Sequence, residues 1–258
     1  MDLNLAGKAV IVTGGSKGIG LACARAFLAE GARVGIASRS QANIDAALAA
    51  LPGAIGFAAD LADDAAALAM VEAMEAELGP VEILVNSAGA ARRTPPDDLS
   101  PAAYRAAMDA KFFTYVNVID PVVKRMAARG SGVIVNVIGN GGKIASPIHL
   151  PGGAANAGLM LVTAGLAAAY AARGVRVVAV NPGMTETERV TGGLEADARL
   201  VGVTIEEARR RSLARIPLGR PARPDEIADT VLYLASERAS YVTGVAITMD
   251  GGASAVVV

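Results

Sequence analysis

Residues 13–20 read TGGSKGIG, and this stretch decides the fold. It follows directly on an apolar run, residues 8–13, and opens a helical stretch, residues 18–30. Gly14 lets the backbone turn sharply, Gly18 lets it approach a pyrophosphate, and Gly20 lets the helix pack closely against a sheet. A phosphate would then lie at the helix N-terminus, where free N–H groups and the helix dipole favour an anion. The stretch therefore predicts a dinucleotide site in a strand–turn–helix unit rather than an ordinary tight turn.

Outward from this turn, apolar runs alternate with helical stretches to the end of the chain. The strand-like runs are residues 8–13, 32–38, 54–58, 82–86, 132–138, 175–181 and 245–250, and the helical stretches are 18–30, 41–51, 64–78, 99–129, 151–173 and 224–236. The runs are continuously apolar, which is typical of strands covered on both faces. The order predicts an α/β fold: a doubly wound, mostly seven-stranded parallel sheet (Rossmann fold) with helices on both faces.

The composition limits the classes of function. The chain has 258 residues, 53% of them hydrophobic, so it can bury a large core as one domain, residues 1–258. Its 24 basic and 25 acidic residues leave a net charge of −1, so no basic field exists to hold nucleic acid or an anionic membrane. A single cysteine, Cys23, and a single histidine argue against both a disulfide and a structural zinc site.

Targeting signals are not expected either. Asp2 does not fit the basic start of a secretory signal. The apolar run 157–172 ends at Arg173 and is too short for a membrane span, so it is interpreted as a buried helix. We therefore expect a cytoplasmic protein that binds no metal, nucleic acid or membrane.

Residues 184–217 interrupt the alternation between the sixth and seventh strand-like runs. The segment carries many arginine and glutamate residues, and Thr204 with Glu207 has the spacing of a capping box that opens a helix. In α/β sheets, an insertion beyond the carboxyl end of a strand commonly covers the ligand. We expect this segment to be a substrate lid.

The end of the second strand-like run indicates which dinucleotide binds. NAD sites place a carboxylate there to hold the ribose 2′-OH, whereas an arginine accommodates a 2′-phosphate. This chain has Ser38 followed by Arg39, and Lys17 in the glycine-rich turn adds a second cation. Two cations can form charge-assisted hydrogen bonds to a phosphate. We expect NADP(H) in preference to NAD(H); the alternative is that Arg39 is only a solvated loop charge.

Several further motifs make the chain resemble the short-chain dehydrogenase/reductase family, in its single-domain form. They are residues 13–20, Asp60-Leu61, NSAG at 86–89, NPG at 181–183 with Thr185 and Thr187, VTG at 242–244 and DGG at 250–252. The match runs from the first strand to the C-terminus. The resemblance implies an oxidoreductase that acts on a small-molecule carbonyl or alcohol. It also implies a homotetramer or homodimer assembled through the helical stretches 99–129 and 151–173.

The resemblance assigns roles within the cofactor site. It implies that Asp60 accepts a hydrogen bond from the adenine amino group, that residues 86–89 line the adenosine-side ribose and steady the sheet, and that residues 182–187 hold the nicotinamide carboxamide. The expected cofactor-binding residues are Gly14, Ser16, Lys17, Gly18, Ile19, Ser38, Arg39, Asp60, Leu61, Asn86, Ala88, Gly89, Lys111, Asn156, Pro182, Gly183, Met184, Thr185 and Thr187.

The catalytic positions depart from the family pattern. The family uses a tyrosine as proton donor, a lysine four residues later that lowers the pKa of the phenol, a serine on the fifth strand and an asparagine in the fourth long helix. The positions that match these four carry Gly152, Asn156, Gly139 and Lys111, respectively. A phenol with a pKa of about 10 needs such a cation to work at neutral pH. The two glycines leave extra volume that a substrate or water could fill.

Two of the changes look reciprocal, because a lysine is lost at Asn156 and gained at Lys111 on a facing helix. We hypothesise that the ammonium group stays in the pocket and that Asn156 still bonds ribose hydroxyls. The alternative is that Lys111 reaches into water in an inactive chain. His149, three residues before Gly152, could replace the phenol as acid–base, or could simply fill an apolar turn. The expected catalytic residues are Lys111, Asn156 and His149.

Other polar residues near these positions have less definite expectations. Asn140 and Lys143 follow the fifth strand and could bind a carbonyl or carboxylate oxygen. Tyr115 lies one helical turn from Lys111 and is expected to pack against a neighbouring helix. Arg92 and Arg93 are expected to be solvated loop charges. Two other functions stay open, since a fold does not fix a function: a non-redox lyase or hydrolase, and a nucleotide-binding protein without catalysis.

Overall fold

The seven expected strands form one parallel sheet in a computed structural model that describes residues 2–89 and 91–255. The strand order is β3-β2-β1-β4-β5-β6-β7. The strands are β1 (Ala9–Thr13), β2 (Arg33–Ser38), β3 (Ile55–Ala58), β4 (Ile83–Asn86), β5 (Gly132–Val137), β6 (Val175–Pro182) and β7 (Ala246–Met249). Every strand end lies within one residue of its expected position. The predicted fold class is therefore confirmed.

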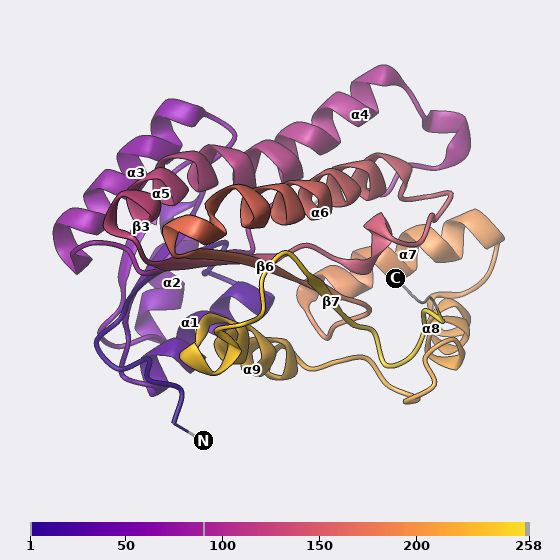
Figure 1. The fold of residues 1–258 in the computed structure, drawn as a ribbon. Helices are drawn as coiled ribbons and strands as arrows, with labels where there is room; N and C mark the ends of the chain where they lie inside the picture. The colour runs from indigo at the N-terminus through magenta and orange to yellow at the C-terminus, as the bar shows by residue number, and fades with distance from the viewer. Residues whose placement is uncertain (1, 90, 256–258) are drawn as a thin grey trace.

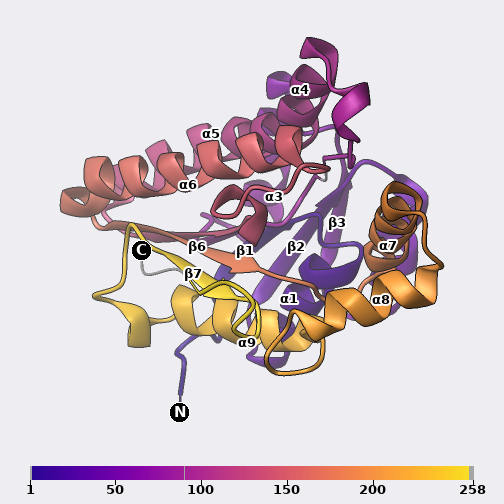
Figure 2. The ribbon, with the colours of Figure 1, turned by 90° about the vertical axis from the view of Figure 1, so that its right-hand side faces the viewer.

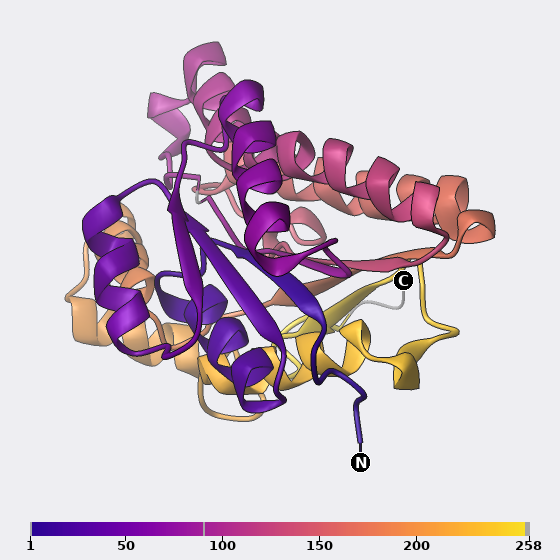
Figure 3. The ribbon, with the colours of Figure 1, turned by 90° about the vertical axis from the view of Figure 1, so that its left-hand side faces the viewer.

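Helices cover both faces of the sheet (Figures 1, 2 and 3). On one face lie α1 (Gly18–Ala29), α2 (Gln41–Ala49) and α9 (Pro224–Ala235), and on the other lie α3 (Asp64–Leu78), α5 (Thr114–Arg129) and α6 (Leu150–Tyr170). Strand β1 shows why its sequence is continuously apolar. Val10 and Val12 join the core beneath α1, whereas Ala9 and Ile11 join the core beneath α3 and α5. Both faces of the strand are therefore buried.

The helical stretch expected over residues 99–129 is interrupted. Ser100 caps a short helix, α4 (Pro101–Ala107), by accepting a hydrogen bond from the Ala103 N–H at 3.2 Å. Residues Met108–Phe113 then form a π-helical turn, hereafter the π turn, before α5 begins. A π turn holds one more residue than an α-helical turn and is often found at functional sites. It contains Lys111, whose side chain is buried.

The expected lid, residues 184–217, contains two helices, α7 (Glu188–Val201) and α8 (Ile205–Ala214). Figure 2 shows both at one end of the sheet. The predicted start of α8 is confirmed, because Thr204 Oγ1 accepts a hydrogen bond from the Glu207 N–H at 3.2 Å. The Glu207 carboxylate binds Arg210 and Arg211. Helix α7 was not anticipated from the sequence.

Helix α6 is less buried than expected. The helical segment Leu150–Arg173 is long and apolar enough to cross a membrane by length and composition, and 28% of its apolar window is buried. One face, which includes Asn156, Leu159 and Thr163, packs inward. Leu161 on the opposite face is 75% exposed. The interpretation as a buried helix is therefore wrong for the outer face.

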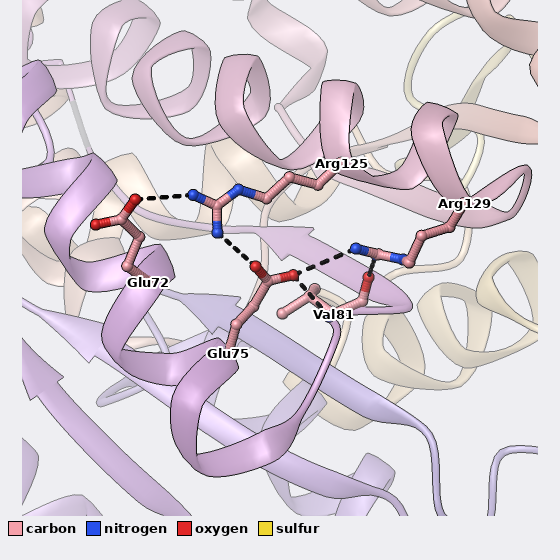
Figure 4. A network of polar contacts seen from close by, with 5 residues as sticks. All are labelled: Glu72, Glu75, Val81, Arg125 and Arg129. Atoms are coloured by element: carbon pink, nitrogen blue, oxygen red, sulfur yellow. Dashed lines mark hydrogen bonds and ion pairs between the residues drawn. The ribbon is translucent and has the colours of Figure 1, made fainter.

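An ion-pair network joins α3 to the C-terminal half of α5 (Figure 4). Arg125 binds both Glu72, at 3.0 Å, and Glu75, and the two carboxylates raise its pKa. Arg129 lies 3.5 Å from Glu75 and donates to the carbonyl of Val81. Glu75 also accepts a hydrogen bond from the Val81 N–H at 3.0 Å. The network fixes α5 against α3 and thereby anchors the helix that follows the π turn.

Candidate cofactor and active site

The expected cofactor-binding residues gather at one edge of the sheet. Apart from Lys111 in the π turn and Asn156 in α6, they lie at or just beyond the carboxyl ends of β1, β2, β3, β4 and β6, and the carboxyl ends of parallel strands meet at the same edge. The strand order reverses direction between β1 and β4. Such a switch point, outside the carboxyl ends of the strands, is where open α/β sheets bind their ligands. The fold therefore brings this set of residues together.

The glycine-rich turn between β1 and α1 has no room for side chains. A β-carbon on Gly14, at φ +66°, would lie 2.7 Å from the carbonyl oxygen of Ser87, and one on Gly20 would lie 2.3 Å from the Gly14 oxygen. Gly18 has φ +54° and borders Thr187 of the lid. Ile19 is partly buried against the core, so its backbone is what faces the turn. This cradle of bare backbone at a helix N-terminus fits a dinucleotide pyrophosphate.

The residues expected near the adenosine ribose lie on the ends of β1 and β2. Ser16 Oγ donates to Ser38 Oγ at 3.0 Å, which links the two strand ends. Arg39 is exposed next to Ser38. Lys17 is not simply solvated, because its amine pairs with Glu188 at the start of α7 at 3.3 Å. Lys17 thus links the glycine-rich turn to the lid.

The residues expected beside adenine lie just beyond β3 and β4. Asp60 is exposed, and one of its carboxylate oxygens accepts a hydrogen bond from the Ala62 N–H at 3.1 Å. The Leu61 carbonyl accepts a hydrogen bond from Asn117 at 3.0 Å. The Ala88 N–H donates to Thr13 Oγ1 at 3.3 Å. Gly89 has φ +82°, and a β-carbon there would lie 2.0 Å from the Ala110 carbonyl oxygen. Position 89 therefore requires glycine.

Asn86 belongs to a buried chain of polar side chains that crosses the sheet. Thr13 Oγ1 donates to its Oδ1 at 3.3 Å, and its amide nitrogen donates to Asn136 Oδ1 at 3.0 Å. Asn136 in turn donates to Thr163 Oγ1 of α6 at 3.0 Å. The side chain of Asn86 thus steadies the sheet. Asn136 and Thr163 were not identified from the sequence as members of this chain of polar side chains. Each is a polar residue inside an apolar run, and that pattern could have indicated a buried hydrogen bond.

The expected nicotinamide-side residues connect the end of β6 to α7. A β-carbon on Gly183 would lie 2.7 Å from Asp250 Cβ, so the strand end packs tightly on the segment after β7. Thr185 Oγ1 donates to the Gly183 carbonyl at 3.3 Å, and the Met184 carbonyl accepts a hydrogen bond from the Ala222 N–H at 2.9 Å. Pro182 ends β6, and Thr187 is the residue before α7.

Lys111 points inward and does not reach into solvent. Its side chain is only 7% exposed, and its amine donates to Tyr115 Oη at 2.7 Å and to the Val137 carbonyl at 3.2 Å. Tyr115 is fully buried, and its hydroxyl also donates to the Val137 carbonyl at the end of β5. Tyr115 shares its buried cluster with residues of the neighbouring helices α3 and α6, as expected, and its hydroxyl adds contacts with Lys111 and with the end of β5.

Asn156 approaches the same strand end from α6, which lies on the same face of the sheet as α5. It is 6% exposed, and its amide nitrogen donates to the Gly139 carbonyl at 3.5 Å. Gly139 has φ +125°, and a β-carbon there would lie 3.3 Å from the Asn156 amide nitrogen. Lys111 and Asn156 thus contact main-chain oxygens two residues apart, at Val137 and Gly139. The hypothesised exchange between them stays a prediction.

His149 occupies the volume beside Gly152. A β-carbon on Gly152 would lie 2.2 Å from Cε1 and 2.7 Å from Nε2 of the imidazole. A β-carbon on Gly141 would lie 2.8 Å from His149 Cδ2 and 3.6 Å from the Asn156 amide nitrogen. The imidazole therefore fills the space that a side chain at position 152 would occupy. The volume expected to be vacant there holds His149 instead.

The surroundings of His149 disfavour its charged form. Burial lowers the pKa of the imidazole below its ordinary 6.5, and the positive charges of Arg93 and Lys111 lower it further. Arg93 is not the solvated loop charge expected from the sequence, because it pairs with Asp197 of α7 at 2.7 Å. The Thr94 N–H also donates to the Ile148 carbonyl at 2.9 Å. The loop after β4 therefore joins the lid to the loop that carries His149.

Three buried polar atoms at this edge have no hydrogen-bond partner among the residues described. They are Asn140 Oδ1, His149 Nδ1 and Asn181 Oδ1. The Asn140 amide nitrogen donates to Asp250 at 2.9 Å and to Ser254, and the Lys143 amine donates to the Ala246 carbonyl at 3.5 Å. Asn140 and Lys143 therefore tie the loop after β5 to β7 and to the segment that follows it. A buried polar atom left unpaired costs about 1–3 kcal/mol. Their clustering indicates that a polar ligand belongs here.

Comparisons with known proteins agree with this geometry. The family model described as enoyl-(acyl carrier protein) reductase matches residues 14–254. The chain is 35% identical over 258 residues to D-threitol dehydrogenase of Mycolicibacterium smegmatis, a match that covers 97% of this chain and 94% of that protein. A crystal structure of actinorhodin polyketide ketoreductase with NADPH superposes with a TM-score of 0.93 at 32% identity, over 96% of this chain and 98% of that one.

A second solved structure is more distant. Xylitol dehydrogenase bound to NAD+ superposes with a TM-score of 0.92 at 23% identity, over 96% of this chain and 100% of that one. This likeness concerns the fold alone. One similar structure thus holds NADPH and another holds NAD+.

Proposed function

Because the chain belongs to the short-chain dehydrogenase/reductase family, we propose that it is an NADP-dependent oxidoreductase that oxidises an alcohol to a carbonyl. In this proposal His149 accepts the proton that the family's tyrosine otherwise handles. The observation that carries it is the imidazole of His149 in the space beside Gly152. A substrate hydroxyl also fits the unpaired, buried His149 Nδ1 and its neighbours at this edge.

The chain's own residues divide the work of binding. The bare glycine turn and the N-terminus of α1 hold the pyrophosphate. The exposed carboxylate of Asp60 would accept a hydrogen bond from the adenine amino group, and Asn156 would offer its amide to ribose hydroxyls. When bound, a nicotinamide dinucleotide supplies the hydride acceptor. The protein's remaining tasks are to orient the alcohol and to take its hydroxyl proton.

The protonation state of His149 decides whether its imidazole can accept or donate a proton. Burial and two nearby cations lower its pKa, so the imidazole is mainly neutral at pH 7. A neutral imidazole accepts a proton, as alcohol oxidation requires, whereas carbonyl reduction needs the protonated form. Lys111 supports the neutral state through its charge. The electrostatics of this site therefore favour the form of His149 that serves as a proton acceptor at neutral pH.

The preference for NADP+ rests on Arg39 and Lys17 at the ends of β1 and β2. Arg39 is exposed beside Ser38, where a carboxylate would hold the 2′-OH of NAD+. Lys17 already reaches across this region to Glu188. Both cations can form charge-assisted hydrogen bonds to a 2′-phosphate.

The experiment that tests the proposed function measures initial rates with a panel of small alcohols and either dinucleotide, for the wild type and His149→Asn. We expect NADP+-dependent oxidation of at least one alcohol, and a loss of about 10²-fold or more in His149→Asn. Turnover that needs no dinucleotide would instead favour a lyase or hydrolase. Full activity in His149→Asn would show that His149 is not the proton acceptor.

We also propose that the chain forms a homodimer or homotetramer through the outer faces of α5 and α6. Phe113 and Leu161 are exposed there, and Gly165 has open space beside it, so another helix could approach closely. Light scattering after gel filtration tests this. Leu161→Glu should shift the mass toward the monomer, and a wild-type monomer would refute the proposal.

A further inference from the structure

Tyr115 and Lys111 form a buried pair on the helix that begins in the π turn. Side chains on a helix lean toward its N-terminus, so a residue at i+4 reaches back over residue i. Here the Lys111 amine lies 4.4 Å from the centre of the Tyr115 ring and donates to the phenol oxygen at 2.7 Å. The tyrosine therefore contacts the lysine both through its ring face and through its hydroxyl.

The Val137 carbonyl completes a triangle with these two groups. Both the Lys111 amine and the Tyr115 hydroxyl donate to it. Val137 is the last residue of β5, and the strand end continues directly into Gly139, whose carbonyl contacts Asn156. The triangle therefore fixes the lysine at the end of β5, which Asn156 also contacts. The positive charge of Lys111 lowers the pKa of His149.

We infer that Tyr115 is a positioning residue, which holds the Lys111 ammonium against the Val137 carbonyl at the end of β5, the strand end that Asn156 also contacts. The inference rests on the proposed function only for the role of His149. Tyr115 itself is fully buried with its hydroxyl on a main-chain carbonyl, so it does not reach reacting atoms. Its contribution comes through Lys111.

The physical reason is the cost of a buried ammonium. Charged groups are stable in the interior only when hydrogen bonds replace the water that they lose. Without the Tyr115 hydroxyl, the ammonium would lose an acceptor, and it would lose charge or shift toward solvent. Either change weakens its effect on His149. The charged groups that act on His149 are Arg93, from the loop after β4, and Lys111, from the π turn; Arg93 is itself paired with Asp197.

The chain offers a direct readout, because His149 is its only histidine. Nuclear magnetic resonance of the imidazole can follow its titration in the intact protein without any substrate. We expect Lys111→Met to raise the pKa of His149, and Tyr115→Phe to raise it in the same direction by a smaller amount. Tyr104→Phe, which removes the hydroxyl of an exposed tyrosine on α4, is the matched control and should titrate like the wild type.

Kinetics supply the second readout. Tyr115→Phe should shift the pH profile of kcat for alcohol oxidation to higher pH, following the raised pKa of His149, with an unchanged KM for the dinucleotide. If Tyr115→Phe does not fold, Tyr115→Met serves for the same comparison. A purely structural role would lower stability but leave the titration of His149 unchanged.

Two outcomes would overturn the inference: Tyr115→Phe titrating like the wild type while Lys111→Met shifts, or Lys111→Met leaving the pKa of His149 unchanged. Failure of the proposed function has a different signature. In that case the wild type oxidises no alcohol, while the His149 pKa still responds to Tyr115→Phe.

Discussion

The imidazole of His149 and the α-carbon of Gly152 are in direct contact: a β-carbon on residue 152 would lie 2.2 Å from the imidazole Cε1. The two residues are three apart in sequence, at the start of α6. The absence of a side chain at position 152 therefore makes room for the imidazole of His149. The catalytic proposal depends on this pair.

Gly152→Ala should displace the imidazole and lower alcohol oxidation by about tenfold or more, because general-base catalysis contributes ~10²–10⁴. Gly192→Ala, also inside a helix, is the matched control, since nothing lies within 4 Å of its β-carbon. Both substitutions raise helix propensity equally. Steady-state rates of the two variants decide the question, and equal rates would contradict the contact between residues 149 and 152.

The rate of alcohol oxidation should rise with pH as His149 loses its proton. Burial and the charges of Arg93 and Lys111 lower the pKa of His149 below 6.5, so the midpoint of the rise should lie below pH 6.5. The rate of the reverse reduction should fall over the same range, since it needs the protonated imidazole. Profiles of kcat/KM against pH test this. A midpoint above pH 7 would contradict the assignment to His149.

Arg39→Ala should raise the KM for NADP+ by about tenfold, because the 2′-phosphate loses a charge-assisted hydrogen bond. The KM for NAD+ should change little, since NAD+ has no phosphate at that position. Arg25→Ala, at an exposed position on α1, controls for the general loss of positive charge. Equal effects of Arg39→Ala on both dinucleotides would contradict the proposed preference.

Asp197→Asn should loosen the lid by breaking the ion pair with Arg93. Because the pair is partly exposed, its worth is about 0.2–1 kcal/mol, which corresponds to an increase of up to about fivefold in the KM for substrate. Glu195→Gln on the same helix removes a carboxylate elsewhere on α7 and should leave the KM unchanged. An unaltered KM in Asp197→Asn would mean that the ion pair does not hold the lid.

Glu75→Gln should lower the free energy of unfolding by about 1–2 kcal/mol, because Glu75 is mostly buried and binds Arg125, Arg129 and the Val81 N–H (Figure 4). Glu77→Gln, exposed on the same helix, should change it by less than about 0.5 kcal/mol. Denaturant titration measures both. Equal stability of the two variants would show that the network contributes little.

The sequence predicted the fold well because its signals are local. Continuously apolar runs marked every strand, and residues 13–20 marked the dinucleotide turn. Features that depend on distant partners were missed. The π turn arises where Lys111 is drawn to the end of β5, and the Arg93–Asp197 pair joins residues 104 positions apart.

The candidate site shows the same division. Lys111 and Asn156, which the sequence pairs as a reciprocal exchange, both contact the end of β5, at Val137 and Gly139, and the exchange itself stays a prediction. The involvement of Tyr115 was not expected, because a tyrosine four residues from a lysine looks like ordinary helix packing. What distinguishes Tyr115 from an ordinary packing residue is the hydrogen bond of its buried hydroxyl to the Val137 carbonyl of β5. The catalytic roles themselves stay predictions.

The π turn also has a consequence for how this chain can change length. Each residue advances a helix by about 100°, so deleting one residue between Met108 and Phe113 would convert the turn to α-helical phase. Everything before the deletion would rotate by that angle relative to α5, and a deletion after Lys111 would turn the lysine away from Tyr115. Homologous chains that keep this arrangement should therefore tolerate exchanges of residue type here more readily than insertions or deletions.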